Sequence, residues 1–107
     1  MSRHQATSDV FLAIADPTRR ALLDALREGE KPVMELAAQF EVTLSAVSQH
    51  IRVLREAGLV DVRKAGRERY YTLNAAPLQS VADWVAQHEA FWQEKLAALA
   101  QHLEEEK

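Results

Sequence analysis

The chain has 107 residues, which suits one domain, and we expect that domain to span residues 1–107. Its apolar fraction of 48% and charged fraction of 27% are ordinary for a folded globular protein and argue against disorder. The absence of cysteine excludes disulfides and thiolate metal sites, and the formal net charge of −3 taken alone argues against a nucleic-acid-binding protein.

Two short helices are predicted at the start of the chain. The first begins at Ser8 or Asp9, either of which can cap it, and the Asp16-Pro17 pair breaks it. Pro17 suits the first turn of a second helix that Asp16 caps and Gly29 ends. The expected core positions of this second helix are Leu22, Leu23 and Leu26.

Two further helices are predicted on either side of a tight connection at residues 41–42. The third helix spans roughly residues 33–40, and Thr43 can cap the fourth, which Gly58 ends. The fourth helix has one apolar face, made of Leu44, Val47, Ile51 and Leu54. Its opposite face is polar and basic, and consists of Ser45, Ser48, Gln49, Arg52 and Arg55.

The pattern then changes from helical to extended. A strand at residues 59–64 and a return strand at 69–73 form a hairpin with Gly66-Arg67 at its tip. Pro77 opens a last helix that reaches about Glu105. Its apolar stripe consists of Leu78, Val81, Val85, Trp92, Leu96, Leu99 and Leu103. The predicted fold class is therefore mostly α with a small β-hairpin.

This order of elements predicts a winged helix-turn-helix, in which the second helix of the pair can enter the major groove of DNA. The distribution of charge supports a role in DNA binding. Residues 1–41 have five basic and seven acidic side chains. Residues 42–74 have six basic and three acidic side chains, and residues 75–107 have two basic and six acidic ones. The net charges are therefore −2, +3 and −4, and the only positive third holds the predicted reading helix and the hairpin.

Four segments resemble the ArsR/SmtB-type bacterial repressors. They are residues 14–26 (IADPTRRALLDAL), 35–38 (ELAA), 47–60 (VSQHIRVLREAGLV) and 63–71 (RKAGRERYY). The resemblance covers roughly residues 10–103. It implies a homodimer, joined through the first and last helices, that binds an imperfect palindrome in a promoter and blocks transcription. The long apolar stripe of the last helix agrees with this dimer. The expected dimer contacts are Phe11, Ile14, Val81, Val85, Trp92, Leu96 and Leu99.

Two sets of residues are expected to contact double-stranded operator DNA. Short polar side chains suited to base edges are Thr43, Ser45, Ser48 and Gln49, although Thr43 has an equally good interpretation as a helix cap. Basic side chains suited to phosphate or the minor groove are Arg52, Arg55, Arg63, Lys64, Arg67 and Arg69. Arg67 is favoured because it is at the hairpin tip, whereas Arg19 and Arg20 are expected to have structural roles.

The effector, whether metal, small molecule or protein, is left open by the sequence. The zinc-type site of the family needs a D-x-H pair, but Asp83 is followed by Trp84 and Val85. His88 and His102 are about 21 Å apart on one helix, so a zinc or nickel sensor would need His102 from a second copy. We favour solvent-exposed histidines over this alternative. Another alternative is a protein-interaction module that pairs with a different regulator.

No other class of function is favoured. The sequence shows no nucleophile–base pair, paired acids or phosphate-binding loop, so we expect neither an enzyme nor a cofactor. No apolar run reaches the roughly 18–20 residues that cross a bilayer, and the N-terminal residues lack the apolar core of a signal peptide. We therefore expect a cytoplasmic protein that does not contact a membrane.

Overall fold

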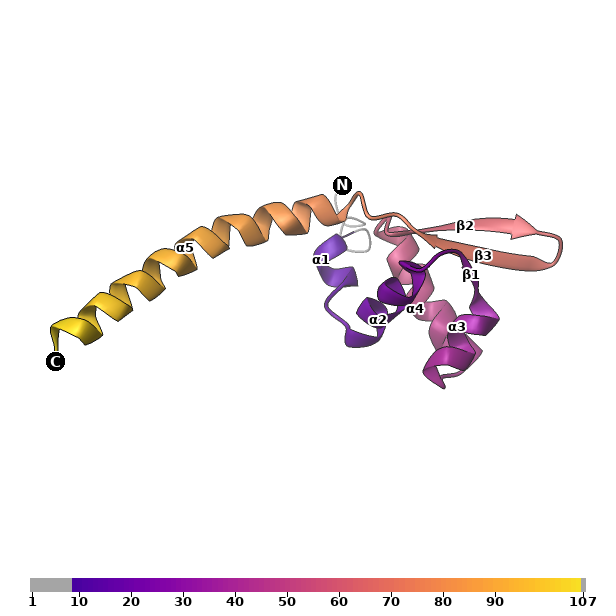
Figure 1. Cartoon of the computed structure of the whole chain (residues 1–107). Coiled ribbons are helices and arrows are strands. Elements are labelled where there is room, and N and C mark those ends of the chain that lie inside the picture. Colours follow the sequence, from indigo (N-terminus) through magenta and orange to yellow (C-terminus); the bar gives the residue numbers. More distant parts are fainter. Residues whose placement is uncertain (1–8, 107) are drawn as a thin grey trace.

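The computed structural model describes residues 9–106 and contains five helices and three short strands within that range (Figure 1). In chain order they are α1 (Val10–Ala13), α2 (Pro17–Leu26), β1 (Lys31–Pro32), α3 (Val33–Phe40), α4 (Leu44–Glu56), β2 (Val60–Ala65), β3 (Glu68–Leu73) and α5 (Leu78–Glu105). The predicted order of four helices, a hairpin and a long last helix is confirmed. The first helix is shorter than predicted, and Ser8, one of its two predicted caps, lies outside the described residues.

Side-chain caps fix where three of the helices begin. The carboxylate of Asp9 accepts a hydrogen bond from the Phe11 amide at 2.8 Å, and that of Asp16 accepts one from the Arg19 amide at 3.0 Å. The Thr43 hydroxyl accepts one from the Ala46 amide at 3.0 Å. Each bond satisfies an amide that has no partner inside its helix.

The corner between α1 and α2 is held by two arginines. Arg19 donates from Nε to the Ala13 carbonyl at 2.7 Å and from Nη2 to the Leu12 carbonyl at 3.1 Å. Arg20 donates from Nη1 to the Ile14 carbonyl at 2.8 Å. These carbonyls lie at the end of α1, where the last turn of a helix leaves carbonyl groups free to accept from side chains. The structural role predicted for both arginines is confirmed.

The turns around α4 use left-handed backbone at Glu41 and Gly58. Glu41 has φ 55° and separates α3 from α4, where the tight connection was predicted. Gly58 has φ 81°, and the amide of the next residue, Leu59, donates to the Leu54 carbonyl at 2.9 Å. That bond closes the end of α4 and turns the chain directly into β2, as the glycine predicted.

The predicted two-stranded hairpin is part of a three-stranded antiparallel sheet in the order β1-β3-β2. The prediction missed β1, which pairs Lys31 with Tyr71 and Pro32 with Tyr70. Proline has no amide hydrogen to donate to a ladder, and it is tolerated here because β1 is an edge strand. A two-residue strand that contains proline gives no periodic signal in the sequence.

The core is formed where α2, α3 and α4 pack against the sheet. Its largest fully buried side chains are Leu22, Leu36, Ile51, Leu54, Leu59 and Val47. The predicted buried face of α4 is therefore correct for three of its four members. It is wrong for Leu44, whose side chain is 45% exposed. Leu44 is the first residue of α4, and the neighbouring Val42 packs against the core instead.

Helix α5 extends far beyond this core (Figure 1). Leu78 and Val81 in its first turns pack against the core, and the Trp84 ring lies edge-on to Phe11 of α1 with 6.2 Å between centroids. No residue of α5 is fully buried. The radius of gyration is 19.0 Å, whereas a compact chain of this length has about 13 Å. Within the described part of the chain, no helix is long and apolar enough to cross a membrane.

Candidate nucleic-acid interface

Helix α4 has two faces of different chemistry. Val47, Ile51 and Leu54 are buried at positions three and four residues apart. The opposite face is exposed, as predicted, and consists of Ser45, Ser48, Gln49, Arg52 and Arg55. The burial of one face fixes the rotation of the helix, so the polar and basic side chains are held toward solvent.

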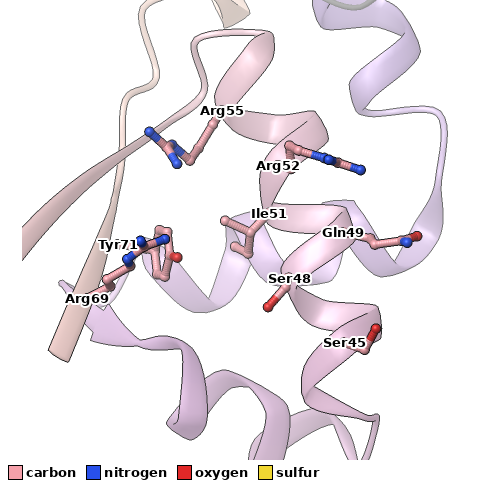
Figure 2. Close-up of a pocket in the computed structure, with 8 residues that line it drawn as sticks. All are labelled: Ser45, Ser48, Gln49, Ile51, Arg52, Arg55, Arg69 and Tyr71. Carbon is pink, nitrogen blue, oxygen red and sulfur yellow. The ribbon is translucent and has the colours of Figure 1, made fainter. Parts of the chain in front are cut away.

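A cavity of about 390 Å³ lies between α4 and β3 (Figure 2). The residues that line it are Ser45, Ser48, Gln49, Ile51, Arg52, Arg55, Arg69 and Tyr71. Three of these residues are arginines and none is acidic, so the cavity is positively charged and suited to an anion. The structure thus brings together six of the predicted DNA contacts, together with Ile51 and Tyr71, which were not predicted as contacts.

The wing consists of strands β2 and β3, and its basic residues lie on two different faces of these strands. Lys64 pairs with Arg69 and Val62 pairs with Tyr71, so these four residues share one side of the sheet. Arg69 and Tyr71 belong to the cavity with α4, which identifies this side as the one that faces α4. Arg67 follows Gly66, whose φ is 64°, at the exposed tip. Lys64 and Arg69 therefore share the wing face that is directed toward α4, and Arg67 is exposed at the tip.

Arg63 lies on the other face of the wing, opposite Tyr70 in the ladder. Its Nε and Nη2 donate to the two carboxylate oxygens of Glu30 at 2.9 and 2.7 Å, and its guanidinium lies 4.9 Å from the centroid of the Tyr70 ring. These hydrogen bonds hold the pKa of Glu30 below its ordinary value and raise the pKa of Arg63. The guanidinium of Arg63 is thus paired within the chain, and its predicted phosphate contact stays a prediction.

Glu30 and Tyr71 are the functional candidates that sequence reasoning missed. Glu30 is 33 residues from Arg63, and a single acidic residue in a loop indicates no partner. Tyr71 is buried, at 6% exposure, but it also lines the cavity. The shared strand face of residues 69 and 71 was the signal that could have found it.

The three histidines within residues 9–106 have local structural partners. His50 lies at the side of α4, where its Nδ1 is 3.4 Å from Nη1 of Arg19. His88 donates from Nδ1 to the Trp84 carbonyl at 2.9 Å and stacks on the Trp84 ring, and His102 lies 3.0 Å from Glu106. Residues 9–106 contain no group of three metal-ligating side chains. A site shared between His88 and His102 of a second copy stays a prediction.

The predicted dimer contacts fall into two groups. Two of them, Ile14 and Val81, are half-buried because they pack against the core of their own chain. The remainder have exposed fractions between 41% and 59%, and are Phe11, Val85, Trp92, Leu96 and Leu99. The exposed group continues along α5 past the end of the core, so it forms an apolar surface that residues 9–106 leave exposed.

Known proteins are similar to this chain in sequence and in fold. Residues 16–62 match the family model described as bacterial regulatory protein, arsR family. The chain is 37% identical over 106 residues to an HTH-type transcriptional regulator of Mycobacterium tuberculosis, which covers 99% of this chain and 96% of that protein. It is 35% identical over 78 residues to the transcriptional repressor SdpR of Bacillus subtilis, which covers 73% of this chain and 87% of that protein.

A solved structure gives the same result. The ArsR-like transcriptional regulator from Rhodococcus sp. RHA1 superimposes with a TM-score of 0.73 at 33% identity, over 94% of this chain and 91% of that one. Sequence and fold agree, and the resemblance seen in the sequence is confirmed. The chain belongs to the arsR family of bacterial regulatory proteins, which are DNA-binding regulators of transcription.

Proposed function

We propose that this protein is a homodimeric cytoplasmic repressor that binds a promoter palindrome through α4 and the wing and blocks transcription by occupying the DNA. The observation that carries the proposal is the face of α4. Its exposed polar and basic side chains lie directly opposite its buried ones and continue into the basic cavity shared with β3. An exposed helix of this kind has the dimensions and chemistry to enter a major groove.

The polar part of this face is suited to reading bases. Ser45, Ser48 and Gln49 are short donors and acceptors, and a glutamine can pair bidentately with adenine. Thr43 lies at the same end of α4, but its hydroxyl already accepts the Ala46 amide. We assign Thr43 primarily to the helix cap.

The basic part is suited to phosphates, which hold the protein in register without reading sequence. Arg52, Arg55 and Arg69 line the cavity, Lys64 shares the wing face of Arg69, and Arg67 is exposed at the wing tip. We assign Arg63 to the support of the wing, because Glu30 and Tyr70 occupy its guanidinium. Residues 42–74 carry a net charge of +3 although the whole chain carries −3, so the phosphate contacts fall within the positive third.

The second copy would cover the exposed apolar surface of α1 and α5. The part of α5 that extends beyond the core has three large apolar side chains that are more than half exposed, namely Trp92, Leu96 and Leu99. Large exposed apolar surfaces of this kind are typical of subunit interfaces. A two-fold dimer would present two α4 helices, which matches an operator with half-sites one helical turn apart. The protein would need no cofactor for this activity.

Selection of binding sites from random duplex DNA tests the proposal. We expect one palindromic motif to be enriched, and Gln49→Ala to lose discrimination at one position of each half-site while it still binds DNA. We expect Arg67→Ala to weaken binding to all sequences and to lower the salt slope by about one. Arg27→Ala, a change of the same charge at an exposed position on the loop after α2, is the matched control. Failure to enrich any motif would contradict the proposal and favour a module that binds another protein.

A further inference from the structure

We infer that Arg55, Arg69 and Tyr71 form a seat for a single phosphate of the DNA backbone, and that this seat sets how deeply α4 enters the groove. The inference rests on the DNA binding proposed above and adds a specific contact to it. It assigns two arginines to the same phosphate and gives a buried tyrosine a role in binding.

The three side chains approach one space from two elements. Arg55 comes from the last turn of α4, and Arg69 and Tyr71 come from one face of β3. All three line the same cavity. Figure 2 shows that Gln49 and Arg52 extend from the other side of α4, away from the strand. The cavity thus has a phosphate end between helix and strand, and a separate reading side.

The charges at this end have no counter-charge among the residues that the structure describes. Arg55 and Arg69 take part in none of the ion pairs formed within residues 9–106, and no acidic side chain lines the cavity. Two cations that share a small cavity repel each other, and an anion between them removes that cost. A phosphate diester has two free oxygens, and each can accept the paired N–H groups of one guanidinium.

Tyr71 adds a neutral donor at the base of the same space. The residue is only 6% exposed and its ring belongs to the core. Every fully buried side-chain oxygen of the described residues has a hydrogen-bond partner. The Tyr71 hydroxyl forms no hydrogen bond with another described residue, so it is not fully buried. Its hydroxyl therefore reaches the cavity surface, and Figure 2 shows it on the side of the ring that faces α4. A donor held by a buried ring has little conformational entropy to lose on binding.

The position of the seat along α4 explains why it would control how deeply this helix enters the groove. Arg55 follows Gln49 by six residues and Ser45 by ten, or roughly 9 and 15 Å along the helix axis. A phosphate fixed beside Arg55 therefore sets the distance between the backbone of the DNA and the reading residues at the other end of α4. The contact itself is independent of sequence, because every step of the duplex offers the same phosphate.

A double-mutant cycle on the salt dependence of binding tests whether the two arginines share one phosphate. The affinity for the selected duplex is measured from low to moderate salt for wild type, Arg55→Gln, Arg69→Gln and the double variant, with Arg27→Gln as the control. Each single variant should bind more weakly with nearly the wild-type slope, because one guanidinium remains to neutralise the phosphate. The double variant should lose about 0.9 from the slope, the value for one phosphate. A loss of about 1.8 would mean two separate phosphates, and an unchanged slope would mean no contact; either result overturns the inference.

Tyr71→Phe tests the third member, because it removes the hydroxyl and keeps the ring. We expect an affinity loss of about tenfold with an unchanged salt slope, since the lost donor is neutral. Thermal unfolding confirms that the variant is folded. Wild-type affinity in a folded Tyr71→Phe protein would exclude the tyrosine from the seat. Absence of DNA binding by the wild type would refute the proposed function and the seat together, whereas a normal wild type with an unchanged double variant would refute the seat alone.

Discussion

Thr43 illustrates how one side chain can fit two interpretations that differ in their measurable consequences. Its hydroxyl accepts the Ala46 amide at the start of α4. We predict that Thr43→Ala lowers the free energy of unfolding by about 1 kcal/mol, because that amide loses its partner. Thr43→Ser, which keeps the hydroxyl, should unfold like the wild type in urea. If Thr43→Ala has wild-type stability but weaker DNA binding, the residue is a DNA contact and not a cap.

The ion pair between Glu30 and Arg63 gives a prediction about pH. The pKa of Glu30 is held below its ordinary value of 4.5, mainly by hydrogen bonds from Arg63. The stability that Glu30 contributes is therefore complete above its unfolded pKa and is lost as the pH falls through its lower pKa in the folded protein. NMR titration of the Glu30 carboxyl carbon should give a pKa below 4.5 in the wild type and an ordinary value in Arg63→Gln. A Glu30 pKa that Arg63→Gln leaves unchanged would show that the pair does not form in solution.

Prediction from sequence succeeded at the residue scale where the signal is local. Asp16 and Thr43 were recognised as helix caps because a cap is defined by the residue type and the few positions that follow it. The partners Glu30 and Arg63 could not be recognised, because their pairing depends on how the loop after α2 lies beside β2. Such contacts between distant segments exist only in the folded chain.

At the scale of elements, α4 shows that a periodic apolar pattern no longer predicts burial at the end of a helix. Leu54 is fully buried, whereas Leu44 on the same predicted stripe is 45% exposed. We predict that Leu54→Ala costs about 2–5 kcal/mol of unfolding free energy, because it leaves a cavity in the core. Leu44→Ala should change it by no more than about 0.5 kcal/mol. If denaturant unfolding shows that Leu44→Ala and Leu54→Ala lose equal amounts of unfolding free energy, the Leu44 side chain is buried in solution.

The boundaries of the elements were largely predictable because glycine and proline mark them. Gly58, Gly66 and Pro77 each end or begin an element where the sequence suggested. The strand β1 was missed because it has two residues and includes Pro32, which cannot show alternation. The cavity between α4 and β3 was also beyond prediction. Its residues are on two separate elements, and only tertiary packing brings them to one place.

At the scale of the whole molecule, the total charge and its distribution point in different directions. The net charge of −3 weakens general attraction to DNA, whereas the positive third of the chain coincides with α4 and the wing. This division could be found in the sequence because it needs only counting. In the proposed repressor, a low affinity for arbitrary DNA would make binding depend on base contacts and on the geometry of two paired α4 helices.

In the proposed dimer, the long helix α5 would set that geometry. Its exposed stripe includes Leu99, at 53% exposure, on a part of the helix that does not touch the core. A charge placed there should therefore separate two copies without unfolding either one. Gln101 is two residues further along, on the opposite side of the helix, and gives a matched control.

Sedimentation of the protein with its selected duplex tests the central claim most directly, because it reports both DNA binding and assembly. We predict two wild-type chains on each duplex, and the same for Gln101→Asp. Leu99→Asp should sediment as a folded single chain that no longer forms the complex at the same concentration. One wild-type chain per duplex, or a complex of two chains that survives Leu99→Asp unchanged, would contradict the account of a dimer that uses α5 to place two α4 helices on DNA.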